Sequence, residues 1–299
     1  MTRTGAESVA AAVGALPPIG LDELVARADL QSRVDRKYVL PSAEAATFVA
    51  GLAGIARVLE IDGRRSFGYE SLYYDTGSLA SYLLAARKRR RRFKVRRRRY
   101  LDSGLCYLEV KTRGLRDSTI KARMPYDAED SNVLTEAACV FVDEALSSSG
   151  ITGVAAADLV PSLLTRYRRS TLYLPESCSR VTVDTGVAWA LPQGPWRELE
   201  ERAIVETKAP GRACAADRRL WSAGYRPSRI SKYGTGLAAL TPGLPANKWH
   251  PVLRRHLQID LTPASGGTHP AAERRPDHSA AGRHTDQPAV GRHNDRSTS

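Results

Sequence analysis

The stretch from Arg87 to Lys111, RKRRRRFKVRRRRYLDSGLCYLEVK, constrains the fold more than any other part of the chain. From Phe93 onward, polar and apolar residues alternate with a period of two, which is typical of a β-strand. Asp102-Ser103-Gly104 then predicts a tight hairpin, from which a second strand returns. One face of this predicted pair carries Lys94, Arg96, Arg98, Tyr100, Tyr107, Glu109 and Lys111. Such a row of cations repels itself and is costly to desolvate, so the face should be wet or meet a polyanion.

The same pattern of one charged and one apolar face recurs along the chain. Further strands are predicted over residues 33–40, 69–74, 119–126, 163–173, 180–188 and 202–208. Helices are predicted over residues 21–28, 43–59 with Ser42 as N-cap, 132–146, 213–223 and a short segment ending near 240. Two architectures fit: an open sheet with a basic outer face, or a closed barrel lined by the charges with helices outside.

The composition indicates an anionic partner. Lys and Arg number 45 against 32 Asp and Glu, which gives a formal net charge of +13. Nucleic acid, an anionic membrane surface or a phosphorylated molecule would each suit such a charge. The four cysteines form no CxxC pair, which favours reduced thiols over a zinc site or a disulfide framework. We expect no membrane span and a cytoplasmic location, because no apolar run or secretory signal is found.

The six histidines help to divide the chain and to exclude enzyme classes. All of them lie from His250 onward, in the C-terminal fifth of the chain, which is polar and Pro- and Gly-rich from Thr262 onward. We therefore expect a disordered N-terminus over 1–20, one domain over 21–240 and a disordered tail over 241–299. A domain without histidine disfavours Ser-His-Asp hydrolases and zinc hydrolases.

Seven motifs follow one another between about residues 30 and 240: RVDRKYVL, KVRRRRY, LEVK, YRRSTL, RVTVDT, IVETK and SKY. Each motif alone is weak, but in this order they resemble the VTC (vacuolar transporter chaperone) polyphosphate polymerase domain. That domain belongs to the CYTH-like triphosphate tunnel metalloenzyme superfamily. The resemblance implies an α+β fold with a closed antiparallel β-barrel, the triphosphate tunnel, whose interior is basic and whose helices pack outside. It also implies a divalent ion, Mn²⁺ or Mg²⁺, held by carboxylate.

The resemblance assigns roles to individual residues. Eight cations would bind phosphate: Lys37, Arg96, Arg98, Lys111, Arg169, Arg180, Lys208 and Lys232. Four of them would act in catalysis: Lys37, Arg96, Arg98 and Lys208. Glu206 would bind the metal, whereas Glu109 is either a second carboxylate near it or a partner for a neighbouring Arg. Alternation places these residues on the charged face except Arg169 and Lys232, whose register the pattern does not determine.

One departure from the superfamily concerns the metal. Tunnel triphosphatases carry Glu-x-Glu-x-Lys in the first strand, where this chain has Arg33-Val34-Asp35-Arg36-Lys37. Without the two glutamates, a second metal position and a triphosphatase activity lose support.

The predicted function is a polyphosphate polymerase that transfers the γ-phosphate of ATP to a growing inorganic polyphosphate chain. Positioning and charge neutralisation supply most of the catalysis in phosphoryl transfer, which suits a domain rich in Arg and Lys. The alternatives are a tri- or polyphosphate hydrolase on the same fold and a non-catalytic polyphosphate-binding module. Nucleic acid is disfavoured because the Arg run lacks interleaved aromatic residues. We interpret residues 87–92 as an exposed basic loop or helix end that attracts the anion.

Overall fold

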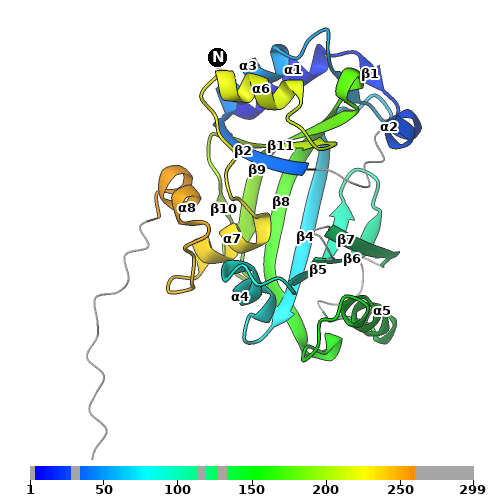
Figure 1. Ribbon diagram of the computed structural model, residues 1–299, viewed down its shortest axis with the longest axis vertical. Coiled ribbons are helices and arrows are strands. Elements are labelled where there is room, and N and C mark those ends of the chain that lie inside the picture. Colours follow the sequence, from blue (N-terminus) through cyan, green and yellow to red (C-terminus); the bar gives the residue numbers. More distant parts are fainter. Residues whose placement is uncertain (1–3, 28–33, 114–118, 127–132, 260–299) are drawn as a thin grey trace, which may run out of the picture. The chain divides into compact units, whose positions relative to one another are not determined.

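The computed structural model describes residues 4–27, 34–113, 119–126 and 133–259. It shows an α+β fold built on one large sheet (Figure 1). The strands are β1 (Pro18–Ile19), β2 (Val34–Pro41), β3 (Arg57–Leu59), β4 (Phe67–Thr76), β5 (Phe93–Tyr100), β6 (Cys106–Arg113), β7 (Thr119–Pro125), β8 (Leu159–Leu174), β9 (Ser179–Ala190), β10 (Arg197–Glu198) and β11 (Arg202–Ala209). The α-helices are α1 (Gly5–Gly14), α2 (Leu21–Arg27), α3 (Ser42–Ala50), α4 (Ala80–Ala86), α5 (Glu136–Ser147), α6 (Ala215–Ser222), α7 (Lys232–Leu240) and α8 (His250–Leu257).

The sheet is open rather than closed into a barrel. Its main path runs β2-β11-β9-β8-β4-β5-β6-β7, and each neighbouring pair on this path is antiparallel. Within the described residues, the terminal strands β2 and β7 do not pair with each other. The expectation of a closed barrel is therefore wrong. Alternation could not have decided the matter, because an open sheet and a barrel place the same residues on the same face.

Helices cover the apolar face of the sheet in two groups. The first group, α1, α3 and α6, packs on β2, β9 and β11 and buries Tyr38, Leu40 and Val205. The second, α5, packs on β5 and β6 and buries Val95 and Leu108. Figure 1 shows these groups at opposite ends of the sheet. Each fully buried side chain of this size contributes about 1.5–3 kcal/mol, so the apolar face supplies much of the stability and leaves the other face for charge.

A third cluster covers part of the opposite face. Helices α4, α7 and α8 pack on residues such as Val39, Tyr73 and Ile204. The side chains of Val252 and Leu253 from α8 are buried in this cluster together with Trp249. We expected disorder over 241–299, and for 241–259 this expectation is wrong. The polar composition of this segment made its short apolar helix face difficult to recognise in the sequence. The rest of the predicted tail lies outside the described residues.

The N-terminal segment is also ordered where we expected disorder. Helix α1 begins after Thr4, whose side chain forms a capping box with Glu7. Val9 and Val13 lie one turn apart on the helix and are buried against the core. Their stripe is narrow and is flanked by alanines, so the sequence pattern gave little sign of it.

The predicted helix over 43–59 is shorter than expected. Helix α3 ends at Ala50, and Arg57–Leu59 forms strand β3 instead. Gly54 adopts φ +81° between them, a conformation that suits glycine and ends helical geometry. Ser42 is the first helical residue rather than the N-cap, which is Pro41. Among the described helices, all are too short or too polar to cross a membrane.

Candidate functional site

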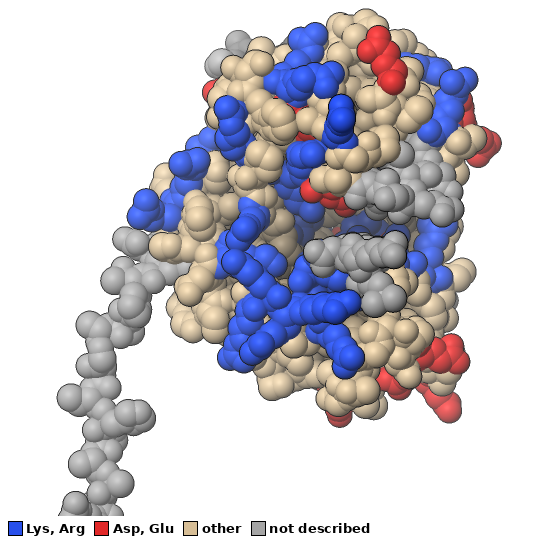
Figure 2. Space-filling model, in the orientation of Figure 1, with Lys and Arg blue, Asp and Glu red and all other residues tan. Residues whose placement is uncertain are grey.

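Cations from seven strands and one helix gather on the face opposite α1, α3 and α6, which we call the basic face. They are Lys37, Lys94, Arg96, Arg98, Lys111, Lys121, Arg169, Arg180, Lys208 and Lys232. Four carboxylates share it: Asp35, Glu109, Asp184 and Glu206. Figure 2 shows Lys and Arg side chains around a hollow near the middle of the molecule. All ten residues predicted as site residues therefore lie together, although their roles remain predictions.

Glu206 lies between two lysines of the same and the neighbouring strand. Its Oε1 atom is 3.5 Å from Lys37 Nζ and 3.7 Å from Lys208 Nζ. Burial alone would raise the pKa of Glu206, but the Lys37 and Lys208 charges hold it well below its usual range. The carboxylate is thus ionised at neutral pH, and both ammonium groups lie beyond hydrogen-bond distance from it.

Asp184 is the anchor of a second ion-pair group. Its Oδ1 and Oδ2 atoms accept hydrogen bonds from Arg169 Nε at 2.6 Å and Arg169 Nη2 at 2.8 Å. Lys232 Nζ also donates to Oδ2. Burial opposes ionisation, but Arg169 and Lys232 lower the pKa of Asp184 to about 2. These contacts make Asp184 a salt-bridge partner of two cations on the basic face.

Glu109 holds the cations of β5 and β7. Arg96 Nε donates to its Oε2 atom at 2.7 Å, Lys121 contacts Oε1, and Arg98 Nη1 lies 4.0 Å away. The Glu109 side chain is 1% exposed. Burial alone would raise its pKa, but the Arg96, Arg98 and Lys121 charges hold it well below the usual range. Of the two roles considered for Glu109, this geometry supports the Arg partner and not the metal ligand.

Three tyrosines, Tyr69, Tyr73 and Tyr167, connect the cations around Asp184 with those around Glu109. The sequence patterns did not reveal them. Arg98 Nη2 donates to the Tyr167 hydroxyl at 3.0 Å. The Tyr167 ring also lies 5.2 Å from the Arg169 guanidinium and 4.2 Å from Lys232 Nζ, within cation–π range. Tyr69 stacks on Tyr167 at 5.2 Å between ring centroids, and the Tyr73 hydroxyl accepts from Arg96. Tyr69 and Tyr73 are four residues apart in β4 and therefore share a face, which was the signal in the sequence that could have revealed these two.

The cations of the basic face act on one another electrostatically, and positive charge remains in excess on this face. The Arg96 charge, burial and the Arg98 and Lys208 charges lower the pKa of Lys111 well below its usual range. Burial, with the Lys37 and Arg96 charges, lowers the pKa of Lys94 to about 7. Burial and neighbouring positive charge both disfavour the protonated form of a lysine. Ten cations against four carboxylates leave a formal excess of six positive charges on this face.

The carboxylates offer limited means to hold a metal ion. Within the described residues, no group of three or more His, Cys, Asp or Glu side chains could coordinate one. Asp184 and Glu109 are already hydrogen-bonded to cations, whereas the lysines beside Glu206 lie 3.5 and 3.7 Å from its Oε1 atom, so of these three carboxylates Glu206 is the fitting donor. Mg²⁺ commonly binds through one or two carboxylates while phosphates and water complete its shell. The face therefore fits a divalent ion that arrives with a phosphate ligand, and does not fit a tightly resident one.

The basic run between α4 and β5 lies at the surface. Residues 87–91 are exposed, and Arg92 is half-buried. This confirms the interpretation of the run as an exposed loop after a helix. Arg92 and Lys88 contribute to the lowered pKa of Lys248, so the loop adds to the positive potential beside the face.

Comparisons with known proteins identify a family. The VTC domain family matches residues 32–241. Among solved structures, a Hippeastrum protein described as an adenylyl cyclase candidate with a dominant triphosphatase activity is 15% identical, with a TM-score of 0.40; the match covers 68% of this chain and 94% of that chain. An adenylate cyclase candidate from Bacillus halodurans is 9% identical, with a TM-score of 0.39. This match covers 79% of this chain and 95% of that chain. A protein from Pyrococcus horikoshii is 14% identical, with a TM-score of 0.37. This match covers 66% of this chain and 91% of that chain. The comparison with curated proteins gave no significant match.

Proposed function

The chain belongs to the VTC domain family, and we propose that its basic face binds ATP and inorganic polyphosphate and transfers the γ-phosphate of ATP to the chain end. The observation that carries this proposal is the convergence of ten cations on one sheet face with four carboxylates. Such an excess of positive charge, with Arg96 and Arg98 buried and most of the other cations partly buried, is unfavourable in the free protein. A polyanion that lies along the face would neutralise this positive charge. The negative charges of a polyphosphate chain are arranged linearly, as are the cations along each strand.

The proposed roles follow from position. Lys37, Lys208 and Arg180 lie beside Glu206, where the reacting phosphates would be held. Arg96, Arg98 and Lys111 lie around Glu109 and would bind a further part of the anion. Arg169 and Lys232 are already paired with Asp184, so they would contact phosphate while Asp184 keeps them in place. A divalent ion bound through Glu206 would neutralise charge that develops on the transferring phosphoryl group.

The carboxylates also bear on the choice of nucleophile. Attack by water is helped by a general base whose pKa lies near the working pH. Glu206, Asp184 and Glu109 are held ionised by cations that lower their pKa values, so they are weak bases. The terminal phosphate of a polyphosphate chain is already anionic and needs no such base. Its oxygen would attack the γ-phosphorus, the bond from that phosphorus to the β,γ-bridging oxygen would break, and ADP would leave. This favours a polymerase over a hydrolase.

The test is incubation of the purified chain with ATP and Mn²⁺, following polymer by gel and ADP by chromatography. We expect long acid-labile chains together with ADP. Lys208→Gln should lower turnover by about 10- to 100-fold, the equivalent of one charge-assisted contact. Glu206→Gln should do the same and should weaken the dependence on Mn²⁺.

The control is Arg99→Gln, which removes an exposed cation of β5 next to Arg98. It should keep native turnover. Release of phosphate without polymer would instead identify a hydrolase. Binding of polyphosphate with neither product would leave a non-catalytic binding module.

A further inference from the structure

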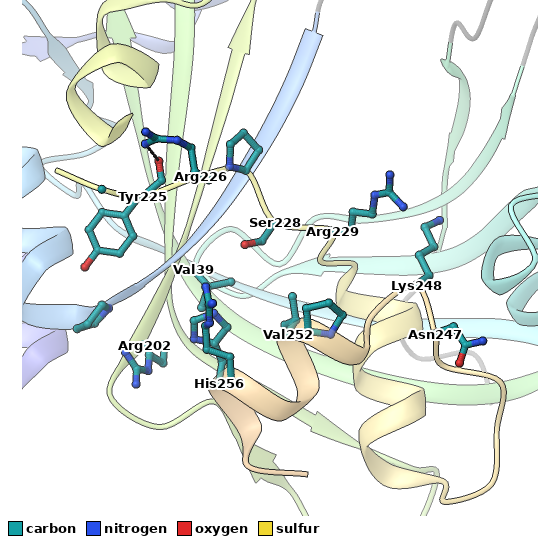
Figure 3. A pocket seen from close by; sticks show the side chains of 15 residues that line it. Val39, Arg202, Tyr225, Arg226, Ser228, Arg229, Asn247, Lys248, Val252 and His256 are labelled. Atoms are coloured by element: carbon teal, nitrogen blue, oxygen red, sulfur yellow. Dashed lines mark hydrogen bonds between the residues drawn. The ribbon is translucent and has the colours of Figure 1, made fainter. Parts of the chain in front are cut away.

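A separate cavity of about 660 Å³ lies beside α8 and was not anticipated from the sequence. It is enclosed by α8, by the segment 224–229 that follows α6, and by the adjacent ends of β2 and β11. We call it the α8 cavity. Its basic lining residues are Arg202, Arg226, Arg229, Lys248, Arg255 and His256. Figure 3 shows Arg229 and Lys248 toward one end, and Arg202 with His256 toward the other.

Within the part of the chain that the structure describes, the cations of the α8 cavity have no acidic partner. None of its lining residues is an Asp or Glu, and among the described residues none of its five cations forms an ion pair. Two of them find only backbone acceptors: Arg226 Nη1 donates to the Trp221 carbonyl at 2.8 Å, and Lys248 Nζ donates to that of Ala85 at 3.1 Å. Cations gathered without counter-charge attract an anion. The basic face differs, since four carboxylates share it.

The imidazole of His256 lies among the cations that line this cavity. Its Nδ1 atom is buried and has no hydrogen-bond partner among residues 4–27, 34–113, 119–126 and 133–259. Burial, together with the Arg202 and Arg255 charges, lowers its pKa to about 4. The imidazole is therefore neutral at physiological pH, surrounded by charges that an anion would compensate.

The cavity is close to the basic face but distinct from it. Ser228 N donates to the Lys37 carbonyl at 2.6 Å, so the segment 224–229 lies along the edge of β2. The Lys37 side chain itself belongs to the basic face beside Glu206. Burial is the main cause of the lowered pKa of Lys94, and Lys248 is among the neighbouring charges that lower it further, so the two regions lie within electrostatic reach of each other.

We propose that the α8 cavity is a second phosphate site, which binds condensed inorganic phosphate without a divalent ion. The absence of any carboxylate from its lining is the reason for the metal independence, because a hard cation would find no charged oxygen ligand there. The occupant is either a short free phosphate chain or the distal part of a chain held on the basic face. Both share the same chemistry, and this site goes beyond the phosphoryl transfer proposed above.

The experiment is calorimetric titration of tripolyphosphate in the presence of EDTA. A Lys37→Gln/Lys208→Gln background weakens the basic face, so the remaining binding reports mainly on the cavity. Adding Arg202→Gln and Arg255→Gln should then lower affinity at least tenfold. The charge-matched control adds Arg99→Gln and Arg254→Gln, two exposed residues outside the cavity lining, and should change affinity less than twofold.

Two further readouts distinguish the outcomes. In the native chain, tripolyphosphate should shift the imidazole NMR signal of His256, which His256→Gln would assign. If tripolyphosphate fails but long-chain polyphosphate loses affinity only in the cavity variant, the site holds the distal part of a chain. Equal losses in the cavity variant and the control, or an unmoved His256 signal with both anions, would overturn the proposal. The polymer assay on the basic face is independent of each of these results.

Discussion

Replacing Asp184 with asparagine gives the sharpest test of how the basic face is held together. Asp184 is fully buried and is bonded to both Arg169 and Lys232. Asparagine keeps the size of the side chain and removes its charge. The substitution leaves two buried cations without their counter-ion, which is the costly way to break a buried ion pair.

The magnitude can be worked from the pKa of Asp184. It lies at about 2 instead of the ordinary 3.8, and each pKa unit corresponds to about 1.36 kcal/mol, so ionisation contributes about 2 kcal/mol at neutral pH. The hydrogen bonds that the amide cannot reproduce add to this, for an expected loss of about 2–4 kcal/mol. In a domain of this size that corresponds to a fall in Tm of about 4–16 °C.

The pH dependence provides the diagnostic readout. Because the pKa of Asp184 is lowered on folding, its contribution is fully present above about pH 4 and is lost as pH falls toward 2. Urea denaturation of both proteins should show a difference that is constant from pH 7 to 5. At pH 3, about half of the charge-dependent part should be gone. Tripolyphosphate should also raise the Tm of Asp184→Asn more than that of the native chain, because it supplies the missing negative charge.

Two comparisons make this reasoning refutable. Asp22→Asn removes the same charge from an exposed helix start and should change stability by less than about 0.5 kcal/mol. Asp184→Asn/Lys232→Met should recover part of the loss, since one unpaired cation is gone. A variant Asp184→Asn as stable as the native chain, or a loss that does not shrink between pH 5 and 3, would refute the assigned role.

Further predictions concern a buried lysine and a glycine contact. Lys94→Met should stabilise the free chain below pH 7 by up to about 5 kcal/mol, because the pKa of Lys94 is lowered from 10.5 to about 7 and its charged form is unfavourable there; loss of its hydrogen bond to Ser231 Oγ reduces this gain. The gain should decline as pH rises from 7 toward 10.5, measured by urea denaturation, while tripolyphosphate affinity falls at pH 6; no gain at pH 6 would contradict this. Gly236→Ala should cost about 2 kcal/mol by thermal unfolding, because its Cβ would overlap the Trp189 ring, whereas Gly77→Ala meets no neighbour and should be nearly neutral. Equal effects at the two glycines would contradict the packing.

The hairpin of β5 and β6 was predictable because its information is local. A strand has a period of two, so alternation from Phe93 assigned Arg96 and Arg98 to one face. The turn at Asp102-Ser103-Gly104 then set the register, which places Arg96 opposite Glu109. Gly104 adopts φ +71° in that turn. For β2, β9 and β11 the same rule placed Lys37, Glu206 and Lys208 with the charged residues.

Other parts could not be predicted because they depend on irregular or distant structure. The register of β8 against β4 shifts between Pro161 and Leu163, so alternation counted from Leu159 fails at Arg169. Lys232 is the first residue of a helix and reaches the sheet from α7. The α8 cavity combines residues from β2, β11, α8 and the segment 224–229. No local pattern relates these segments.

The tyrosines explain how the basic face keeps its charge for a ligand. Arg98, Arg169 and Lys232 all contact Tyr167. Although burial opposes it, the charges of these three residues lower the pKa of Tyr167. A carboxylate at that position would bind the cations more tightly and would cancel one of their charges. An aromatic ring and a phenol oxygen hold them in place while their positive charge remains. The face can therefore be ordered without an anion and still attract one, which requires both the three acidic anchors, Glu109, Asp184 and Glu206, and the neutral aromatic residues between them.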